Sequence, residues 1–163
     1  MKNEEKMVGV ETYLQVSEVL FLISEFHRQC SELYTVLSGK AGEKMVRLLF
    51  DCMAGRERQM GENLERYRNQ APREIMDLWI QFALLPQMDE AAIIDKFTGH
   101  SDISSAVKLG QSLDERLMSN CRFLAENAES MDVRDLFAGL LVLARRDRDL
   151  WKEDEAAVRN HHV

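Results

Sequence analysis

The placement of proline limits this chain more than any other feature of its sequence. Both prolines, Pro72 and Pro86, lie in the middle of the 163 residues. Because proline disrupts a helix interior, the long stretches on either side are free to form uninterrupted helices. No alternating pattern typical of strands stands out, so the sequence predicts an all-α fold.

Four stretches carry apolar side chains at the spacing of an amphipathic helix. In the most regular of them Met45, Leu49, Met53 and Leu64 share one face. We expect four long helices, at about residues 10–37, 44–68, 102–128 and 132–158. Two short helices are expected in the middle connection, one after each proline. The short links after the first and third long helices predict antiparallel neighbours within one domain, residues 1–163.

Local signals also predict where the later helices begin. Asp89, Ser101 and Asp132 stand just before or at the start of apolar periodic segments, where side-chain oxygens commonly cap a helix. In the last helix Asp135 completes a charged variant of the capping box.

Composition excludes several classes of function. The formal net charge of −7 argues against non-specific binding to nucleic acid or to anionic membranes. No apolar run approaches the roughly 20 residues that span a bilayer, and the first residues lack the apolar core of a signal peptide. Hydrolase, P-loop and dinucleotide-binding motifs are missing. We therefore expect a cytoplasmic protein with neither nucleic acid nor membrane as a partner.

The three cysteines, Cys30, Cys52 and Cys121, are odd in number and form no CxxC motif. Each lies in an expected helix beside apolar residues, which indicates buried, reduced thiols. A redox or metal-binding role is the alternative.

Two carboxylates lie on the apolar faces of expected helices. Glu57 follows Met53 by four residues and precedes Met60 by three, and Asp147 lies between Leu143 and Leu150 in the same way. A buried carboxylate is costly unless another group compensates its charge. What these two acids face is therefore the main question about function.

The segments around these acids resemble a known family. MAGRERQMGENLERY and LARRDRDLWKED are similar to the second and fourth helices of the ferritin-like, rubrerythrin-related superfamily, which read L-A-x-x-E-x-x-H. The resemblance covers the four long helices and implies a ferritin-like four-helix bundle. In that superfamily a Glu from each of two helices and a Glu-x-x-His from each of the others bind two iron or manganese ions.

The metal-binding pattern is incomplete in this chain. Glu57 and Asp147 stand at the Glu positions of the second and fourth helices, but Met60 and Leu150 stand at the His positions. The resemblance therefore implies a degenerate di-iron site, in which these two apolar side chains fill core space.

The other two helices are aligned with the superfamily pattern by counting seven residues back from an aromatic residue. From Tyr34 the count gives His27 in the first helix, and from Phe123 it gives Arg116 in the third, with Glu115 beside it. The register of the third helix stays open between these two residues.

Two arrangements follow for the centre of the bundle. In the first, His27, Glu57, Arg116 and Asp147 form an internal salt-bridge cluster that replaces the metal, with Arg116 compensating the carboxylates. In the alternative, His27, Glu57 and Asp147 bind a single Fe or Mn ion.

These inferences favour a non-catalytic bundle without a cofactor that acts in protein interaction, as a homodimer or with another protein. The middle segment supports this with four residues that exceed what one helix face buries: Trp79, Phe82, Leu84 and Leu85. One alternative is an Fe- or Mn-binding oxidoreductase or storage protein with a reduced ligand set. The other is a small-molecule-binding module with a cavity where the metals would lie.

Overall fold

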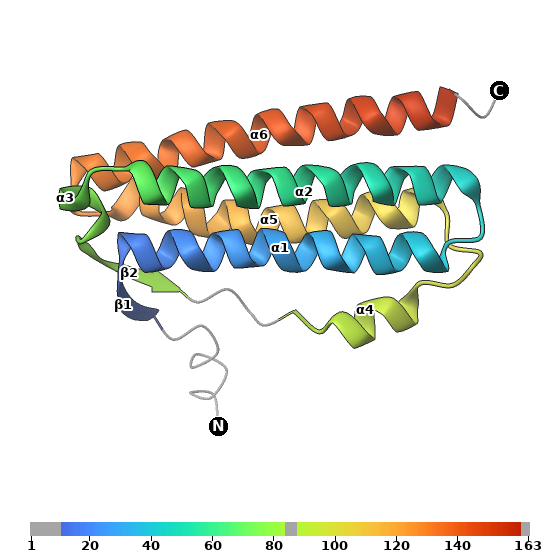
Figure 1. The fold of residues 1–163 in the computed structure, drawn as a ribbon, viewed down its shortest axis with the longest axis horizontal. Coiled ribbons are helices and arrows are strands. Elements are labelled where there is room, and N and C mark those ends of the chain that lie inside the picture. The colour runs from blue at the N-terminus through green and yellow to red at the C-terminus, as the bar shows by residue number, and fades with distance from the viewer. Residues whose placement is uncertain (1–10, 84–87, 161–163) are drawn as a thin grey trace.

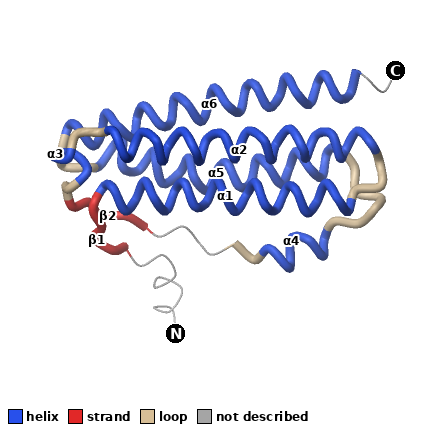
Figure 2. The backbone as a smooth tube through the Cα atoms, viewed as in Figure 1, coloured by secondary structure: helices blue, strands red, loops and turns tan. Residues whose placement is uncertain are grey.

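In the part of the chain that the structure describes, the computed structural model of the protein has four long helices, two short helices and two strands. Figures 1 and 2 show how they are arranged. The structure describes residues 11–83 and 88–160, with the backbone alone at Glu11, Phe82 and Ala83. In chain order the elements are β1 (Glu11–Gln15), α1 (Val16–Lys40), α2 (Lys44–Gln70), α3 (Arg73–Met76), β2 (Trp79–Ala83), α4 (Glu90–Lys96), α5 (Ile103–Asn127) and α6 (Met131–Asn160).

The long helices form two antiparallel hairpins, as the short links predicted. Short turns join α1 to α2 and α5 to α6. The middle connection carries the chain from one end of the bundle to the other, so α2 and α5 run in the same direction (Figure 1). Its last helix, α4, is tied to the end of α1, where the Lys40 ammonium donates to the Ile94 carbonyl at 2.8 Å.

The densest part of the core lies between α1 and α2. Leu20, Tyr34, Leu49 and Phe50 are all at most 1% exposed, and the rings of Tyr34 and Phe50 stack with centroids 6.1 Å apart. Of the predicted apolar face of α2, Leu49, Met53 and Leu64 are buried and Met45 is half-buried. Burying each such side chain contributes about 1.5–3 kcal/mol, so this hairpin supplies a large share of the stability.

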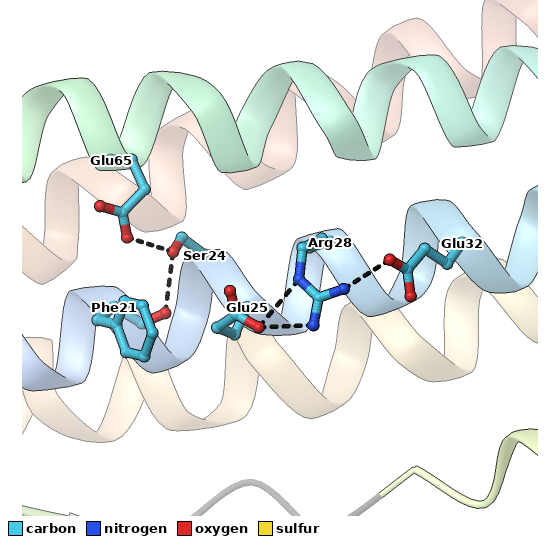
Figure 3. Close-up of polar contacts among 6 residues, drawn as sticks. All are labelled: Phe21, Ser24, Glu25, Arg28, Glu32 and Glu65. Atoms are coloured by element: carbon cyan, nitrogen blue, oxygen red, sulfur yellow. Dashed lines mark hydrogen bonds and ion pairs between the residues drawn. The ribbon is translucent and has the colours of Figure 1, made fainter.

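Polar side chains along α1 divide between the interface and the outer surface. The Ser24 hydroxyl, turned toward α2, lies 2.6 Å from a carboxylate oxygen of Glu65 (Figure 3). Farther along, the Arg28 guanidinium donates to Glu25 and Glu32 on the same helix (Figure 3). Such exposed pairs along one helix contribute only about 0.3–0.5 kcal/mol each.

The ends of two expected helices are strands instead. Residues 11–15 form β1, and the expected helix after Pro72 stops after one turn and is followed by β2. The two strands pair antiparallel, with Tyr13 opposite Gln81 and Gln15 opposite Trp79. Trp79 is exposed while Ile80 is buried, which is the alternation of a half-buried strand. The aromatic and β-branched residues of β2 favour a strand over a helix.

The helix starts are confirmed in one case and corrected in two. Asp89 caps α4 as predicted, since its carboxylate accepts a hydrogen bond from the backbone N–H three residues later. Asp102, not Ser101, caps α5 in the same way. At α6 the hydroxyl of Ser130 accepts the capping hydrogen bond, and Asp132 lies inside the helix.

The face that α6 buries agrees only in part with the apolar face that its spacing predicts. Trp151 and Val158 of that face are buried, whereas Leu140 is half-buried and Leu143 is 52% exposed. Val133, Phe137 and Leu141, which the predicted face did not include, are buried instead. Leu140 and Leu143 border a cavity instead of packed side chains.

A glycine lets α6 approach α5 closely. A Cβ atom at Gly110 would lie 2.6 Å from Cζ2 of Trp151 and 2.9 Å from Cε of Met53. The indole ring of Trp151 occupies the space that a side chain on α5 would need. This contact brings α2, α5 and α6 together.

Candidate functional site

A buried histidine–glutamate pair lies at the centre of the bundle. His27 projects from α1 and Glu57 from α2, and the side chains are 6% and 9% exposed. Nδ1 of the imidazole lies 2.6 Å from Oε2 of the carboxylate. Both residues were predicted to face inward, and the structure brings them together. A hydrogen bond this short between a histidine and a carboxylate is typical of a charge-assisted contact.

Two aspartates complete the polar cluster. Asp114 on α5 and Asp147 on α6 are both partly buried. Burial, and next the charge of Glu57, raises the pKa of Asp114 to about 7, while the Arg148 guanidinium opposes the rise. The same two causes raise the pKa of Asp147. Three carboxylates and one imidazole, one from each long helix, therefore influence one another.

The third helix contributes a different residue from the one expected. Arg116 is exposed and makes no ion pair among the described residues, and Glu115 faces Arg122 and Arg148 at 3.7 and 3.6 Å. Asp114 takes the inward position, so the register was displaced by two residues. The signal for it was its spacing of three and seven residues before the buried Leu117 and Cys121, which places all three on one face.

A cavity of about 610 Å³ lies beside this cluster. Its wall includes His27 and Asp147, but most of it is apolar, with side chains from α2, α5 and α6. Representative lining residues are Leu64, Leu117, Met118, Leu136, Leu140 and Leu143. The volume lies within the range of small-molecule sites, roughly 300–1,000 Å³.

The two apolar residues at the predicted histidine positions line this cavity. Met60 is half-buried and Leu150 is 38% exposed, so neither fills a closed core as expected. They stand where imidazoles would be needed, and neither side chain is a ligand for iron or manganese.

The donor set does not fit a di-iron centre. The superfamily pattern requires four carboxylates and two imidazoles, whereas this centre offers three carboxylates and one imidazole already bonded to Glu57. In residues 11–83 and 88–160, no group of three or more His, Cys, Asp or Glu side chains is placed to hold a metal ion.

Other predicted residues lie away from the cluster. Cys30 and Cys121 are buried as expected, but Cys52 is exposed, which corrects that part of the prediction. Trp79 is 64% exposed at the end of the bundle. The side chain of Phe82, together with Leu84 and Leu85, lies outside the described residues.

No protein-family model matches the chain, and no curated protein matches it. A solved structure does match, the crystal structure of a "putative ferritin-like diiron-carboxylate protein" from Thermotoga maritima. The TM-score is 0.61 at 14% sequence identity, over 88% of this chain and 96% of that chain. In the parts of this chain that the structure describes, no helix is long and apolar enough to cross a membrane. The match confirms the predicted architecture: the chain has the ferritin-like, all-α fold.

Proposed function

We propose that this protein is a ferritin-like bundle that binds a small apolar molecule instead of supporting di-iron chemistry. The proposal rests on one observation, which is the cavity of about 610 Å³ with its mainly apolar wall. Apolar concave sites with a few polar groups are the usual binding sites for small molecules. Protein interaction, which the sequence favoured, therefore becomes the second candidate.

The donor set supports a role without a resident metal. With Met60 and Leu150 at the imidazole positions, a di-iron centre would lack two of its six ligands. The remaining alternative is one Fe or Mn ion held by His27, Glu57 and Asp147. Elemental analysis of protein loaded anaerobically with Fe(II) or Mn(II) tests it, because stoichiometric metal that disappears in Glu57→Ala would support the metal site.

Binding can be tested with the neutral fluorophore N-phenyl-1-naphthylamine. We expect saturable binding of one probe per chain, with fluorescence that rises as the probe leaves water. Leu140→Trp places a larger side chain in the cavity and should weaken binding at least tenfold. Val142→Trp is the matched control, because Val142 is 60% exposed on the same helix, and it should change the affinity less than twofold. Absence of saturable binding, or equal affinities in both variants, would contradict the proposal.

Self-association is the second candidate, supported by two aromatic side chains on the β1–β2 ribbon. Tyr13 and Trp79 are 66% and 64% exposed, and the strand register places them on the same face. Exposed aromatic pairs are common in protein interfaces. Sedimentation across micromolar concentrations should then show a dimer that Trp79→Ser weakens and Phe123→Ser, an exposed control on α5, does not. A monomer at every concentration would contradict this candidate.

We place the protein in the cytoplasm. The support is that Cys30, Cys52 and Cys121 are all free thiols, as expected in a reducing compartment. Acid trapping of the protein from cells followed by thiol titration should find three thiols per chain, and a lower number would contradict this location.

A further inference from the structure

The cavity is elongated, and polar side chains lie among its apolar lining along its length. Its lining on α2 runs from Arg56 to Tyr67, and eleven steps of helix correspond to about 17 Å. α2 and α6 are antiparallel (Figure 1), and an ion pair from Arg56 to Asp154 fixes their relative position. Asp147 therefore lies toward the Arg56 end, whereas Asp135 and Leu136 lie toward the Tyr67 end. A ligand that contacts Asp147 and the apolar part of the wall has one polar head and an apolar body.

Two positive groups at the Arg56 end of the cavity make their direct contacts with other acids. The Arg56 guanidinium donates to Asp154 with Nε and Nη2 at 2.7 and 2.6 Å from the same oxygen. The His27 ring is bonded through Nδ1 to Glu57. Neither group contacts Asp147, although both oppose the rise in its pKa and so compensate part of its charge from a distance. Arg146 also lines the cavity, but it is an exposed residue.

Asp147 is the acid at this end without a partner. It lines the cavity and makes no hydrogen bond or ion pair within residues 11–83 and 88–160. Burial, and next the charge of Glu57, raises the pKa of Asp147, and Asp147 in turn raises that of Asp114, which Arg148 opposes. Asp147 thus offers the cavity a carboxylate that no described side chain contacts directly.

We propose that the ligand of this cavity is an amphipathic amine, with its ammonium group at Asp147 and its apolar body along Leu117, Met118 and Leu140. The inference rests on the proposed function and adds the class of ligand. An ammonium donates hydrogen bonds to Asp147 and forms the direct ion pair that this acid lacks among the described residues. A carboxylate head would stand beside Asp147 and be repelled, and a hydroxyl head could form a hydrogen bond but no ion pair.

Three decyl compounds with different head groups test the class of ligand. Decylamine, decan-1-ol and decanoic acid share one alkyl chain and are compared at pH 7 by displacement of N-phenyl-1-naphthylamine. We expect the amine to bind at least tenfold more tightly than the alcohol, and the acid no more tightly than the alcohol. Asp147→Asn should weaken the amine about tenfold and change the alcohol less than twofold. Asp149→Asn, an exposed neighbour with the same charge change, is the control.

The possible results separate this inference from the proposed function. If the alcohol binds as tightly as the amine, or the acid binds best, the cavity remains a binding site but the class of ligand is wrong. If neither the fluorophore nor any decyl compound binds, both proposals fail. If Asp147→Asn does not fold, the order of affinities of the three decyl compounds for the unmodified protein still tests the class of ligand.

Discussion

Replacing Asp114 with asparagine should stabilise the protein, and the gain should depend on pH. Asp114 is partly buried, makes no hydrogen bond or ion pair among the described residues, and faces the charge of Glu57. Burial and that charge raise its pKa from 3.8 to about 7. A carboxyl group with a higher pKa in the folded state destabilises the fold when ionised, because the unfolded chain holds the charge at lower cost. The penalty is complete above pH 7 and disappears below about pH 4.

The size of the effect follows from that difference in pKa. About three pH units at 1.36 kcal/mol each give about 4 kcal/mol at pH 8. This is an upper bound, because water reaches part of the side chain. At pH 5 the folded state is already protonated at Asp114, and the remaining gain falls to about 1.5 kcal/mol.

Urea unfolding followed by circular dichroism at pH 8 and pH 5 measures this gain. Asp114→Asn keeps the shape of the side chain and removes its charge. Glu126→Gln is the control, because Glu126 is exposed on the same helix and has no described partner. We expect the control to change the free energy of unfolding by less than about 0.5 kcal/mol. An Asp114→Asn protein that is no more stable at pH 8, or that gains equally at both pH values, would refute the reasoning.

Three further predictions concern packing and the central pair. His27→Leu should lower the free energy of unfolding by about 3–5 kcal/mol, since it leaves Glu57 buried without its partner. The double variant His27→Leu with Glu57→Leu should lose much less of that free energy, and a double-mutant cycle measures the coupling between the two residues. Gly110→Ala should lower the free energy of unfolding by about 1–3 kcal/mol, because the new Cβ atom would meet the indole ring of Trp151. Gly139→Ala should raise the melting temperature, because a Cβ atom there meets no other part of the protein within 4 Å and alanine favours the helix. Ellman's reagent should modify Cys52 in the native protein and the two buried thiols only after unfolding.

Helical spacing was enough to predict the main architecture. The period of apolar residues predicted four long helices, and it placed Glu57 and Asp147 on inward faces, where the structure has them. It worked because burial of one face requires that spacing whatever the partner helix is. The strands β1 and β2 were missed because each is five residues long and pairs with a segment more than sixty residues away. Short apolar segments do not distinguish strand from helix by period alone.

The misplaced register of the third helix has a specific cause. Counting back from Phe123 assumed that this aromatic residue faces the core, but Phe123 is 43% exposed. Leu117 and Cys121, which are buried, would have led to Asp114. The prediction for α6 was wrong at Leu143 for another reason, because this residue shares an apolar face with buried residues but borders the cavity. Spacing shows that a face is apolar, and it does not show what fills the space in front of that face.

Two features of the free protein are unfavourable, and one binding event would relieve both. Carboxylates with too little compensating charge destabilise a bundle interior, where well-packed apolar residues are often better by about 1–4 kcal/mol. A cavity lined by leucine and methionine also lacks the contacts that packed side chains would make. An apolar body with a positive head supplies both the contacts and the charge. A bundle with only a structural role needs neither feature. If the two acids serve binding and not the fold, the double variant Asp114→Leu with Asp147→Leu should be more stable than the unmodified protein. It should also bind decylamine no better than decan-1-ol. If that double variant were less stable, the carboxylates would support the fold itself, and their link to the cavity would be lost.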